Sequence, residues 1–492
     1  MSALASLEPR SVWTLFDQLC AIPRPSHREE QAVAWVRAWA DRHDFGVRAD
    51  AFGNLIVDVP ARAGAAPDAP IVVLQGHLDM VGEKNHGVAH DFATDPLEVE
   101  VVDGWVQARG TTLGADNGVG VAMAMAAATD PEVVHGPLEL LLTLAEETGL
   151  EGAMAFDGGL LRGRLLINLD TEEDDSIYIG CAGARAVEAT LPLVRRPLTD
   201  DGEAWVARRL WVRGLRGGHS GMEIGDGRGN AIDLMAQLLI ATLEREFDLE
   251  LVALAGGDQG NAIPRECRAD LWIRRAQLEA LETWLHAHRE GLQKRFAGID
   301  DKVDLTLELL GAPPGADPWT SSSRDAWLRL LDAAPYGVQA MSRAMPGLVE
   351  TSTNPAVVRT DDSTATVLLA SRSSSNPALD ALTQQLISLA RLAGASVKIR
   401  RGYPGWSPDP GSPLVAQAVA AYRTAFDAEP TVQAIHAGLE CGVLVEKVPR
   451  LDAVSIGPDI VGPHSPAEKV RIASVERSWL LLSELLRRLS EI

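Results

Sequence analysis

The sequence predicts an α/β protein in which a mostly parallel-sheet domain is interrupted by an inserted α+β domain with an antiparallel sheet. Helix-like and strand-like segments alternate along the first third of the chain and again near its end, which is typical of a parallel sheet covered by helices. Between these parts, longer strand patterns alternate with surface helices. A chain of 492 residues is also too long to fold around a single hydrophobic core of ordinary size. We therefore place the first domain at 1–185 and 400–492 and the insertion at 186–399.

The first domain is predicted from two kinds of apolar pattern. The stretch REEQAVAWVRAWADRHD has the spacing of an amphipathic helix, whereas runs such as IVVLQG are nearly continuous in apolar residues and indicate strands buried on both faces. In chain order we expect a helix at 28–44, strands at 54–60 and 71–76, a helix at 118–130, strands at 138–146 and 164–170, a helix at 413–426, a strand at 452–457 and a closing helix at 473–489.

The insertion is predicted from a change of character after the stretch GCAGAR. Longer strand patterns there alternate with surface helices, which favours an α+β arrangement built on an antiparallel sheet. We expect strands at 208–215, 267–275, 302–311 and 364–372, and a helix at 278–296.

Composition excludes several classes of protein. The chain is 46% hydrophobic and 23% charged, and its formal net charge of -23 would repel nucleic acid and anionic membranes. Four cysteines, Cys20, Cys181, Cys267 and Cys441, lie far apart and form no C-x-x-C pair, which fits a reducing cytosol. The first residues lack the pattern of a signal peptide, and no run of about 18 apolar residues occurs. We expect a cytoplasmic protein.

Acidic and histidine side chains follow several of the predicted strands. They are His77 and Asp79, Glu146 and Glu147, Asp170, and His464, with Asp116 directly before a predicted helix. Taken singly, each has a plainer interpretation, such as a solvated strand end or an N-cap. The carboxyl ends of parallel strands share one edge, however, and carboxylates crowded there need a cation. Two histidines with three carboxylates suit Zn²⁺, with Mn²⁺ or Co²⁺ possible.

Nine motifs, in order along the chain, resemble one known family. They are LQGHLDMV, ARGTTLGADNGVG, EETGLEGA, INLDTEE, GGHSG, NAIPRE, YPGW, IHAGLECG and SIGPDIVGPHSP. They are similar to those of the aminoacyl-histidine dipeptidases of the PepD type. These enzymes, also called Xaa-His or cytosol non-specific dipeptidases, are co-catalytic dizinc metallopeptidases. The resemblance implies a dizinc peptidase domain and an inserted lid.

The resemblance also implies roles in catalysis. Two Zn²⁺ ions per subunit would be held by Asp116 as the bridge, by His77 and Asp170 on one ion, and by Glu147 and His464 on the other. Asp79 would orient His77 and fix its tautomer. Glu146 would be the general base. A change from EEA, frequent in relatives, to EET touches none of these ligands.

Residues of the insertion are implied to bind substrate. His219 would donate to the carbonyl oxygen as it becomes an oxyanion, often in the active site of the partner subunit, so the resemblance implies a homodimer through the lid. Asn261 and Arg372 would bind substrate, because a guanidinium matches a C-terminal carboxylate. Arg359 is an alternative to Arg372. Glu440, in the last part of the chain, is a candidate for the substrate's ammonium group.

Three functions follow as hypotheses. The first is a metallo-dipeptidase that cleaves unblocked dipeptides, including Xaa-His types. The second is an N-acyl amino acid deacylase of the same fold, which would not require a free substrate ammonium group. The third is a catalytically silent metal-binding or scaffold protein. His86 and His90 are expected in an exposed loop rather than at a metal. The Gly-rich stretch at 110–122 lacks the ending of a P-loop.

Overall fold

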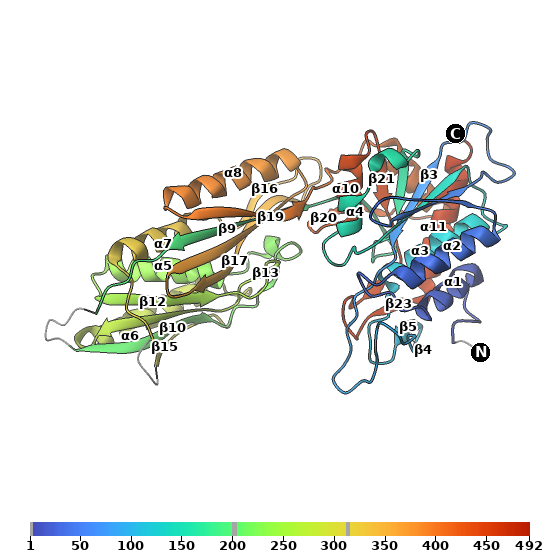
Figure 1. Ribbon diagram of the computed structural model, residues 1–492. Coiled ribbons are helices and arrows are strands. Elements are labelled where there is room, and N and C mark those ends of the chain that lie inside the picture. The colour runs from blue at the N-terminus through green and yellow to red at the C-terminus, as the bar shows by residue number, and fades with distance from the viewer. Residues whose placement is uncertain (1–2, 199–203, 311–314) are drawn as a thin grey trace. The chain divides into compact units, whose positions relative to one another are not determined.

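A computed structural model describes residues 3–198, 204–310 and 315–492. The chain forms two compact units (Figure 1). One combines Met1–Cys181 with Trp406–Ile492, and the other is Ala182–Gly405. The boundaries predicted from the sequence, at 185/186 and 399/400, differ from these by a few residues.

The first unit contains an eight-stranded sheet in the order β1-β2-β6-β3-β7-β21-β8-β20. Its strands are β1 Gly46–Ala49, β2 Leu55–Val59, β3 Val72–His77, β6 Leu138–Thr143, β7 Leu165–Asn168, β8 Ser176–Cys181, β20 Thr431–Ile435 and β21 Asp452–Ser455. Strand β3 is parallel to both β6 and β7, β7 is parallel to β21, and β8 is parallel to β20. This confirms the prediction of a mostly parallel sheet.

The described residues of this unit contain seven α-helices, which are α1 Arg10–Cys20, α2 Glu30–Arg42, α3 Ala115–Thr129, α4 Glu151–Ala155, α9 Pro413–Phe426, α10 Glu440–Lys447 and α11 Ile472–Leu489. Of these, α2, α3, α9 and α11 lie where the apolar patterns predict, whereas α1, α4 and α10 were not predicted. Helix α3 is buried along almost its whole length because its alanines and glycines let it approach the sheet closely. A Cβ at Gly120 would lie 2.3 Å from the carbonyl oxygen of Leu169. This close approach brings the start of α3 near the ends of the central strands.

The second unit is built on a nine-stranded antiparallel sheet in the order β15-β10-β14-β12-β17-β18-β9-β19, with β16 paired to β17. Its strands are β9 Gly183–Pro192, β10 Trp205–Arg213, β12 Leu249–Gly256, β14 Cys267–Arg274, β15 Asp304–Leu309, β16 Gly337–Met341, β17 Val349–Thr360, β18 Thr364–Ser373 and β19 Ser396–Tyr403. The antiparallel sheet confirms the second half of the predicted fold class. Gly311, the end of the predicted strand at 302–311, lies outside the described residues.

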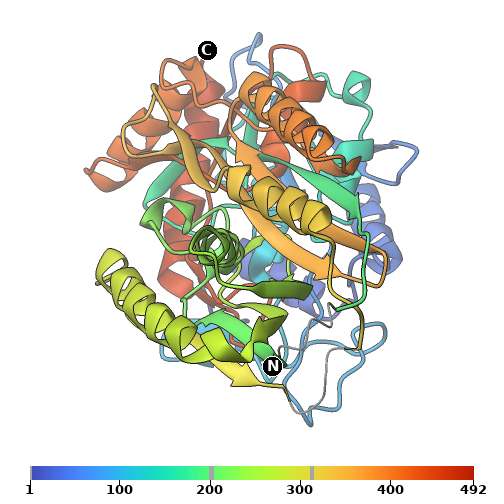
Figure 2. The ribbon, with the colours of Figure 1, turned by 90° about the vertical axis from the view of Figure 1, so that its left-hand side faces the viewer.

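Four helices cover one face of this sheet: α5 Ala231–Glu244, α6 Leu278–Arg295, α7 Ser321–Ala333 and α8 Asn376–Leu392. Figure 2 shows them, coloured green to orange, on one side of the strands. Side chains alternate along β9, where Val187 and Ala189 are buried in the core and the residues between them are partly exposed. A short ribbon, β11 Gly218–His219 with β13 Ala262–Ile263, lies outside the main sheet.

Two smaller features complete the described chain. A four-stranded sheet joins β4 Val99–Val102, β5 Trp105–Ala108, β22 Ile460–Val461 and β23 Lys469–Arg471. Among the described residues, the helices are all too short or too polar to cross a membrane.

Candidate metal centre

Side chains from five separate segments meet at the carboxyl ends of the central strands. Strand β3 ends at His77, β6 leads into Glu146 and Glu147, and β7 leads into Asp170. Within the described chain, three groups could each hold a metal ion, their ligand atoms lying within 4.8 Å of one another. These groups are His77 with Asp116 and Asp170, His77 with Glu146 and Glu147, and Asp116 with Glu147 and His464.

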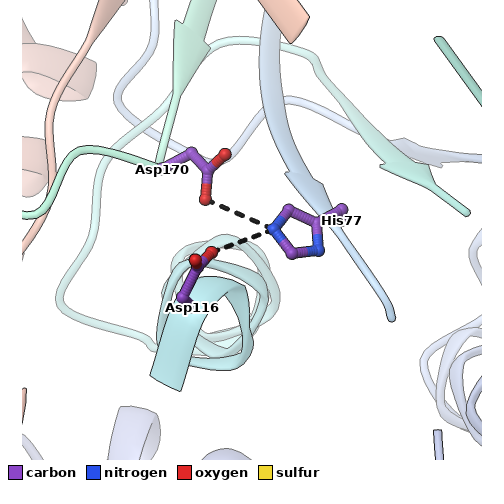
Figure 3. A group of neighbouring side chains, drawn as sticks. All are labelled: His77, Asp116 and Asp170. Carbon is purple, nitrogen blue, oxygen red and sulfur yellow. Dashed lines mark hydrogen bonds and ion pairs between the residues drawn. The ribbon is translucent and has the colours of Figure 1, made fainter. Parts of the chain in front are cut away.

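Asp116 lies between the two histidines. Its Oδ1 is 3.0 Å from Nε2 of His77, and its Oδ2 is 3.2 Å from Nε2 of His464. Asp170 approaches the first histidine at 3.5 Å, as Figure 3 shows, and Glu147 approaches the second at 2.9 Å. Asp116 makes no capping hydrogen bond to the helix amides of α3, so the plainer interpretation of this residue as an N-cap is wrong. The Asp116 carboxylate thus faces both histidines, and a second acid lies beside each of them, Asp170 beside His77 and Glu147 beside His464.

Asp79 is fully buried and contacts both halves of the cluster. Its Oδ1 lies 3.4 Å from Nδ1 of His77 and accepts the backbone N–H of Glu146 at 3.0 Å. Its Oδ2 accepts the backbone N–H of Glu147 at 3.2 Å and the hydroxyl of Ser26 at 2.8 Å. Burial opposes ionisation of Asp79, but the hydrogen bonds from His77, the Glu146 amide and Ser26 lower its pKa to about 2. Asp79 is therefore an anion that positions its neighbours.

The two adjacent glutamates face the cluster because the chain turns before them. Ala145 has a left-handed φ of 50°, which ends the extended run of β6. Oε1 of Glu147 is buried and has no hydrogen-bond partner in the part of the chain that the structure describes, although its Oε2 pairs with His464. Burial raises the pKa of Glu146 well above its ordinary value, and the charges of Asp170 and Glu147 add to this effect.

The charges in this cluster fit a cation. Burial raises the pKa of Asp170 to about 7, and the neighbouring Asp116 carboxylate adds to the shift. Hydrogen bonds that its ring donates to the Asp116 and Glu147 carboxylates raise the pKa of His464 to about 11. Protons thus neutralise these crowded acids, as divalent ions would do. The unpartnered oxygen of Glu147, with two imidazoles and three carboxylates as donors, suits zinc or a similar ion.

Sequence reasoning missed one acid beside this cluster. Glu172 belongs to the acidic run TEEDDS, which is typical of solvated surface. Burial raises its pKa to about 8, and the charges of Asp116 and Asp170 contribute to this rise. Only its position, two residues beyond Asp170, could have indicated this environment.

Glu440 is fully buried at the start of α10. Its Oε2 accepts hydrogen bonds from the amide of Gln75 and from the hydroxyl of Thr143 at 2.6 Å. Its Oε1 has no hydrogen-bond partner among the described residues. Burial raises the pKa of Glu440 to about 7. The predicted role as an ammonium ligand stays a prediction.

The second unit brings together two of the other predicted residues. His219 lies in β11, and its Nε2 is 3.2 Å from Nη2 of Arg372 in β18. Nδ1 of His219 accepts the backbone N–H of Met222 at 3.1 Å, so both ring nitrogens face N–H donors, because the Arg372 guanidinium can only donate. The Arg372 Nη1 lies 3.4 Å from the hydroxyl of Tyr403. His219 and Arg372 therefore lie side by side in the second unit.

The remaining candidates have other surroundings. Asn261 is exposed, and its backbone carbonyl accepts the N–H of Ser220 at 2.8 Å. Arg359, the alternative to Arg372, donates to Asp258 at 2.7 Å and to backbone carbonyls, so its guanidinium is already occupied. His86 is exposed, as predicted, whereas His90 is partly buried and its Nε2 has no hydrogen-bond partner among the described residues, so the prediction is wrong for His90.

Comparison with known proteins agrees with this geometry. Residues 73–488 match peptidase family M20/M25/M40. The cytosol non-specific dipeptidase of Escherichia coli (strain K12) is 42% identical over 489 residues, which cover 99% of each protein. The crystal structure of an aminoacylhistidine dipeptidase from Vibrio alginolyticus has a TM-score of 0.91 at 37% identity and matches 99% of this chain and 98% of that one.

A more distant structure shares the fold alone. The aminopeptidase PepT from Bacillus cereus has a TM-score of 0.56 at 14% identity, with 99% of this chain and 100% of that chain covered. The family resemblance found in the nine motifs is confirmed by the closer relatives. With the match extending over most of its length, the chain belongs to peptidase family M20/M25/M40.

Proposed function

We propose that the protein is a metal-dependent dipeptidase that hydrolyses the peptide bond of unblocked dipeptides, including Xaa-His types. The single observation that carries this proposal is Asp116, whose two oxygens face His77 and His464 on opposite sides. Its bridging position, with acids on either side, supports a two-metal site. The names of the two close relatives, both dipeptidases, support the choice of substrate.

The ions would be two Zn²⁺ per subunit, with Mn²⁺ or Co²⁺ as possible substitutes. Asp116 would bridge them, with the other ligands His77, Asp170, Glu147 and His464. When bound, such ions acidify a shared water and polarise a carbonyl oxygen. The donor set lacks the thiolates of structural zinc sites, and all four cysteines are buried without a disulfide.

Glu146 would carry out the proton transfers of the reaction. It would take a proton from the attacking water and later return it to the departing amine. Its raised pKa, caused mainly by burial, suits a group that must both accept and donate near neutral pH. Asp79 accepts the backbone N–H of Glu146 and also faces His77. It would therefore fix the position of the general base relative to that of the metal ligand.

Substrate length would follow from charges at both ends. Arg372 would bind the C-terminal carboxylate through its fork of donors, with Asn261 beside the substrate backbone. His219 would donate to the developing oxyanion when its Nε2 carries a proton. Glu440 would neutralise the free ammonium group. If one charge binds each end of the substrate, dipeptides would be favoured over longer peptides.

We also expect a homodimer through the inserted unit, acting as a lid, in the cytoplasm. The resemblance to the dipeptidases is the support for both expectations. Light scattering of the purified protein measures the mass in solution. A mass of one chain at assay concentration contradicts the dimer without affecting the rest of the proposal.

The function is tested with three substrates and a chelator. β-Alanyl-histidine, glycyl-histidine and an N-acetylated dipeptide are incubated with the purified protein, and released amino acids are quantified. We expect cleavage of the two unblocked dipeptides only, loss of activity on chelation, and recovery with Zn²⁺, Mn²⁺ or Co²⁺. Release of acetate from the blocked compound would instead favour the deacylase. No turnover of any substrate with metal bound would favour a silent scaffold.

A further inference from the structure

Glu468 holds the segment that carries the bridging carboxylate. It is 2% exposed, and its two oxygens accept backbone N–H groups from four consecutive residues at the start of α3. The distances are 2.7 Å to Leu113, 2.9 Å to Gly114, 2.8 Å to Ala115 and 3.3 Å to Asp116. These amides precede the regular turns of α3, because Asp116 and Asn117 have non-helical φ/ψ, and successive backbone N–H groups of this kind favour a carboxylate. Glu468 follows His464 by four residues, so one loop connects a histidine to Asp116.

Arg24 holds the same segment from its carbonyl side. It is fully buried, and its Nη2 donates to the carbonyl of Gly114 at 2.5 Å. Its Nη1 donates to the carbonyls of Leu78 at 3.0 Å and Asp79 at 2.9 Å. The guanidinium therefore joins the chain directly after His77 to the chain directly before Asp116.

The surrounding backbone leaves room for this guanidinium. A Cβ at Gly114 would lie 2.5 Å from Nη2 of Arg24, and a Cβ at Gly118 would lie 2.6 Å from the same atom. Gly114 also has a left-handed φ of 64°. Burying an arginine and a glutamate is costly unless hydrogen bonds compensate both charges. Here the hydrogen bonds go to the segments that carry His77, Asp79 and Asp116.

We propose that Arg24 and Glu468 are positioning residues that hold the segment Leu113–Asp116 between them and so set the distances among the metal ligands. Arg24 fixes this segment to the end of β3, and Glu468 fixes it to the loop of His464. Neither side chain is needed as a ligand, and each acts through the backbone. The inference rests on the proposed metal centre, but not on the identity of the substrate.

The first test compares two buried glutamates. Glu468→Gln turns one acceptor oxygen into an NH₂ group that faces backbone N–H donors. Glu139→Gln is the matched control, because Glu139 is also fully buried and accepts the backbone N–H groups of Arg162 and Gly163. It lies in β6, outside the candidate metal groups. Zn²⁺ affinity is measured by competition with a fluorescent chelator, and metal content by elemental analysis, with melting temperature as the readout of stability.

We expect Glu468→Gln to bind Zn²⁺ about 10- to 100-fold more weakly than the wild type, the range found for residues that orient ligands. We expect Glu139→Gln to lower the melting temperature and leave the Zn²⁺ affinity unchanged. An unchanged affinity in Glu468→Gln overturns the proposal. Equal losses in both variants also overturn it, because they would reflect general destabilisation.

A second pair of variants tests the proposal even if the Glu468→Gln protein does not fold. Gly114→Ala places a methyl group against Arg24 and keeps both charges. Gly104→Ala imposes the same kind of strain at a φ of 82°, with nothing within 4 Å of the new Cβ. Only Gly114→Ala should weaken Zn²⁺ binding, and equal affinities for the pair contradict the proposal. If the wild-type protein binds Zn²⁺ but cleaves no dipeptide, only the proposed function is contradicted. If the wild-type protein binds no divalent ion, the proposed function and this inference are both contradicted.

Discussion

Asp79 accepts the backbone N–H of Glu146 at 3.0 Å while its carboxylate also faces Nδ1 of His77 at 3.4 Å. One buried acid therefore links a proposed metal ligand to the proposed general base. If His77 binds metal and Glu146 transfers the proton, as proposed, a shift of Asp79 would affect both steps.

For Asp79→Asn, we expect a 10- to 100-fold loss of metal affinity or activity, because an NH₂ group would face the donors of His77 and Glu146. Ser26→Ala is the control, since it removes only the hydrogen bond of 2.8 Å to Asp79 and should cost about 1 kcal/mol. Chelator competition and kcat/KM measure the two effects. Similar results for the two variants would contradict the coupling role of Asp79.

Glu146 and Glu147 should separate metal binding from chemistry. Glu146→Gln should retain two ions per subunit and lose turnover by at least about 100-fold, because general-base catalysis supplies about 100- to 10,000-fold. Glu147→Ala should lose metal, because it removes a partner of His464. Elemental analysis and single-turnover kinetics are the measurements. Equal metal contents in the two variants would refute this division.

Arg372→Lys should raise KM for dipeptides by about 10- to 100-fold, equivalent to the roughly 1.5–3 kcal/mol of a charged hydrogen bond. Arg359→Lys should change KM little, because the Arg359 guanidinium is occupied by Asp258 and by backbone carbonyls. A dipeptide with an amidated C-terminus should bind equally weakly to the wild type and to Arg372→Lys. A larger effect at Arg359 would assign the carboxylate to that residue instead.

Metal affinity should rise with pH between about 6 and 8. In the metal-free protein, burial raises the pKa of Asp170 to about 7, and hydrogen bonds donated to the Asp116 and Glu147 carboxylates raise that of His464 to about 11. A raised folded-state pKa means that the protein keeps these protons at neutral pH, and a bound cation must displace them. Each displaced proton makes the apparent affinity change about tenfold per pH unit. Calorimetry in buffers of different ionisation enthalpy counts the protons, and a count of zero would contradict this account.

The sequence placed most of the candidate ligands at the ends of strands because strong apolar runs precede them, and their role as metal ligands stays a prediction. The apolar run before His77 predicts a strand, which the structure confirms as β3. The apolar run before Asp170 also predicts a strand, which the structure confirms as β7. The plain pattern of Asp116 before a helix indicated an N-cap, whereas its side chain faces two histidines. Its function there depends on partners that are remote in sequence.

Contacts between remote segments could not be predicted in the same way. Arg24 and Glu468 make their hydrogen bonds to backbone atoms far away in sequence, and no motif distinguishes either from a surface charge. Strand β21 was predicted, but its position between β7 and β8 was not, because sheet order is set by long-range pairing. Glu172 was missed because an acidic run is typical of solvent-exposed surface.

The place of the insertion has a consequence for biosynthesis. During translation, His77, Asp116, Glu147 and Asp170 are synthesised first. The whole second unit is then synthesised before β21 and His464. Until then the central sheet lacks one inner strand and the centre lacks one imidazole. A nascent or prematurely terminated polypeptide is therefore unable to assemble the complete centre, so peptide cleavage starts only after translation has passed the last ligand.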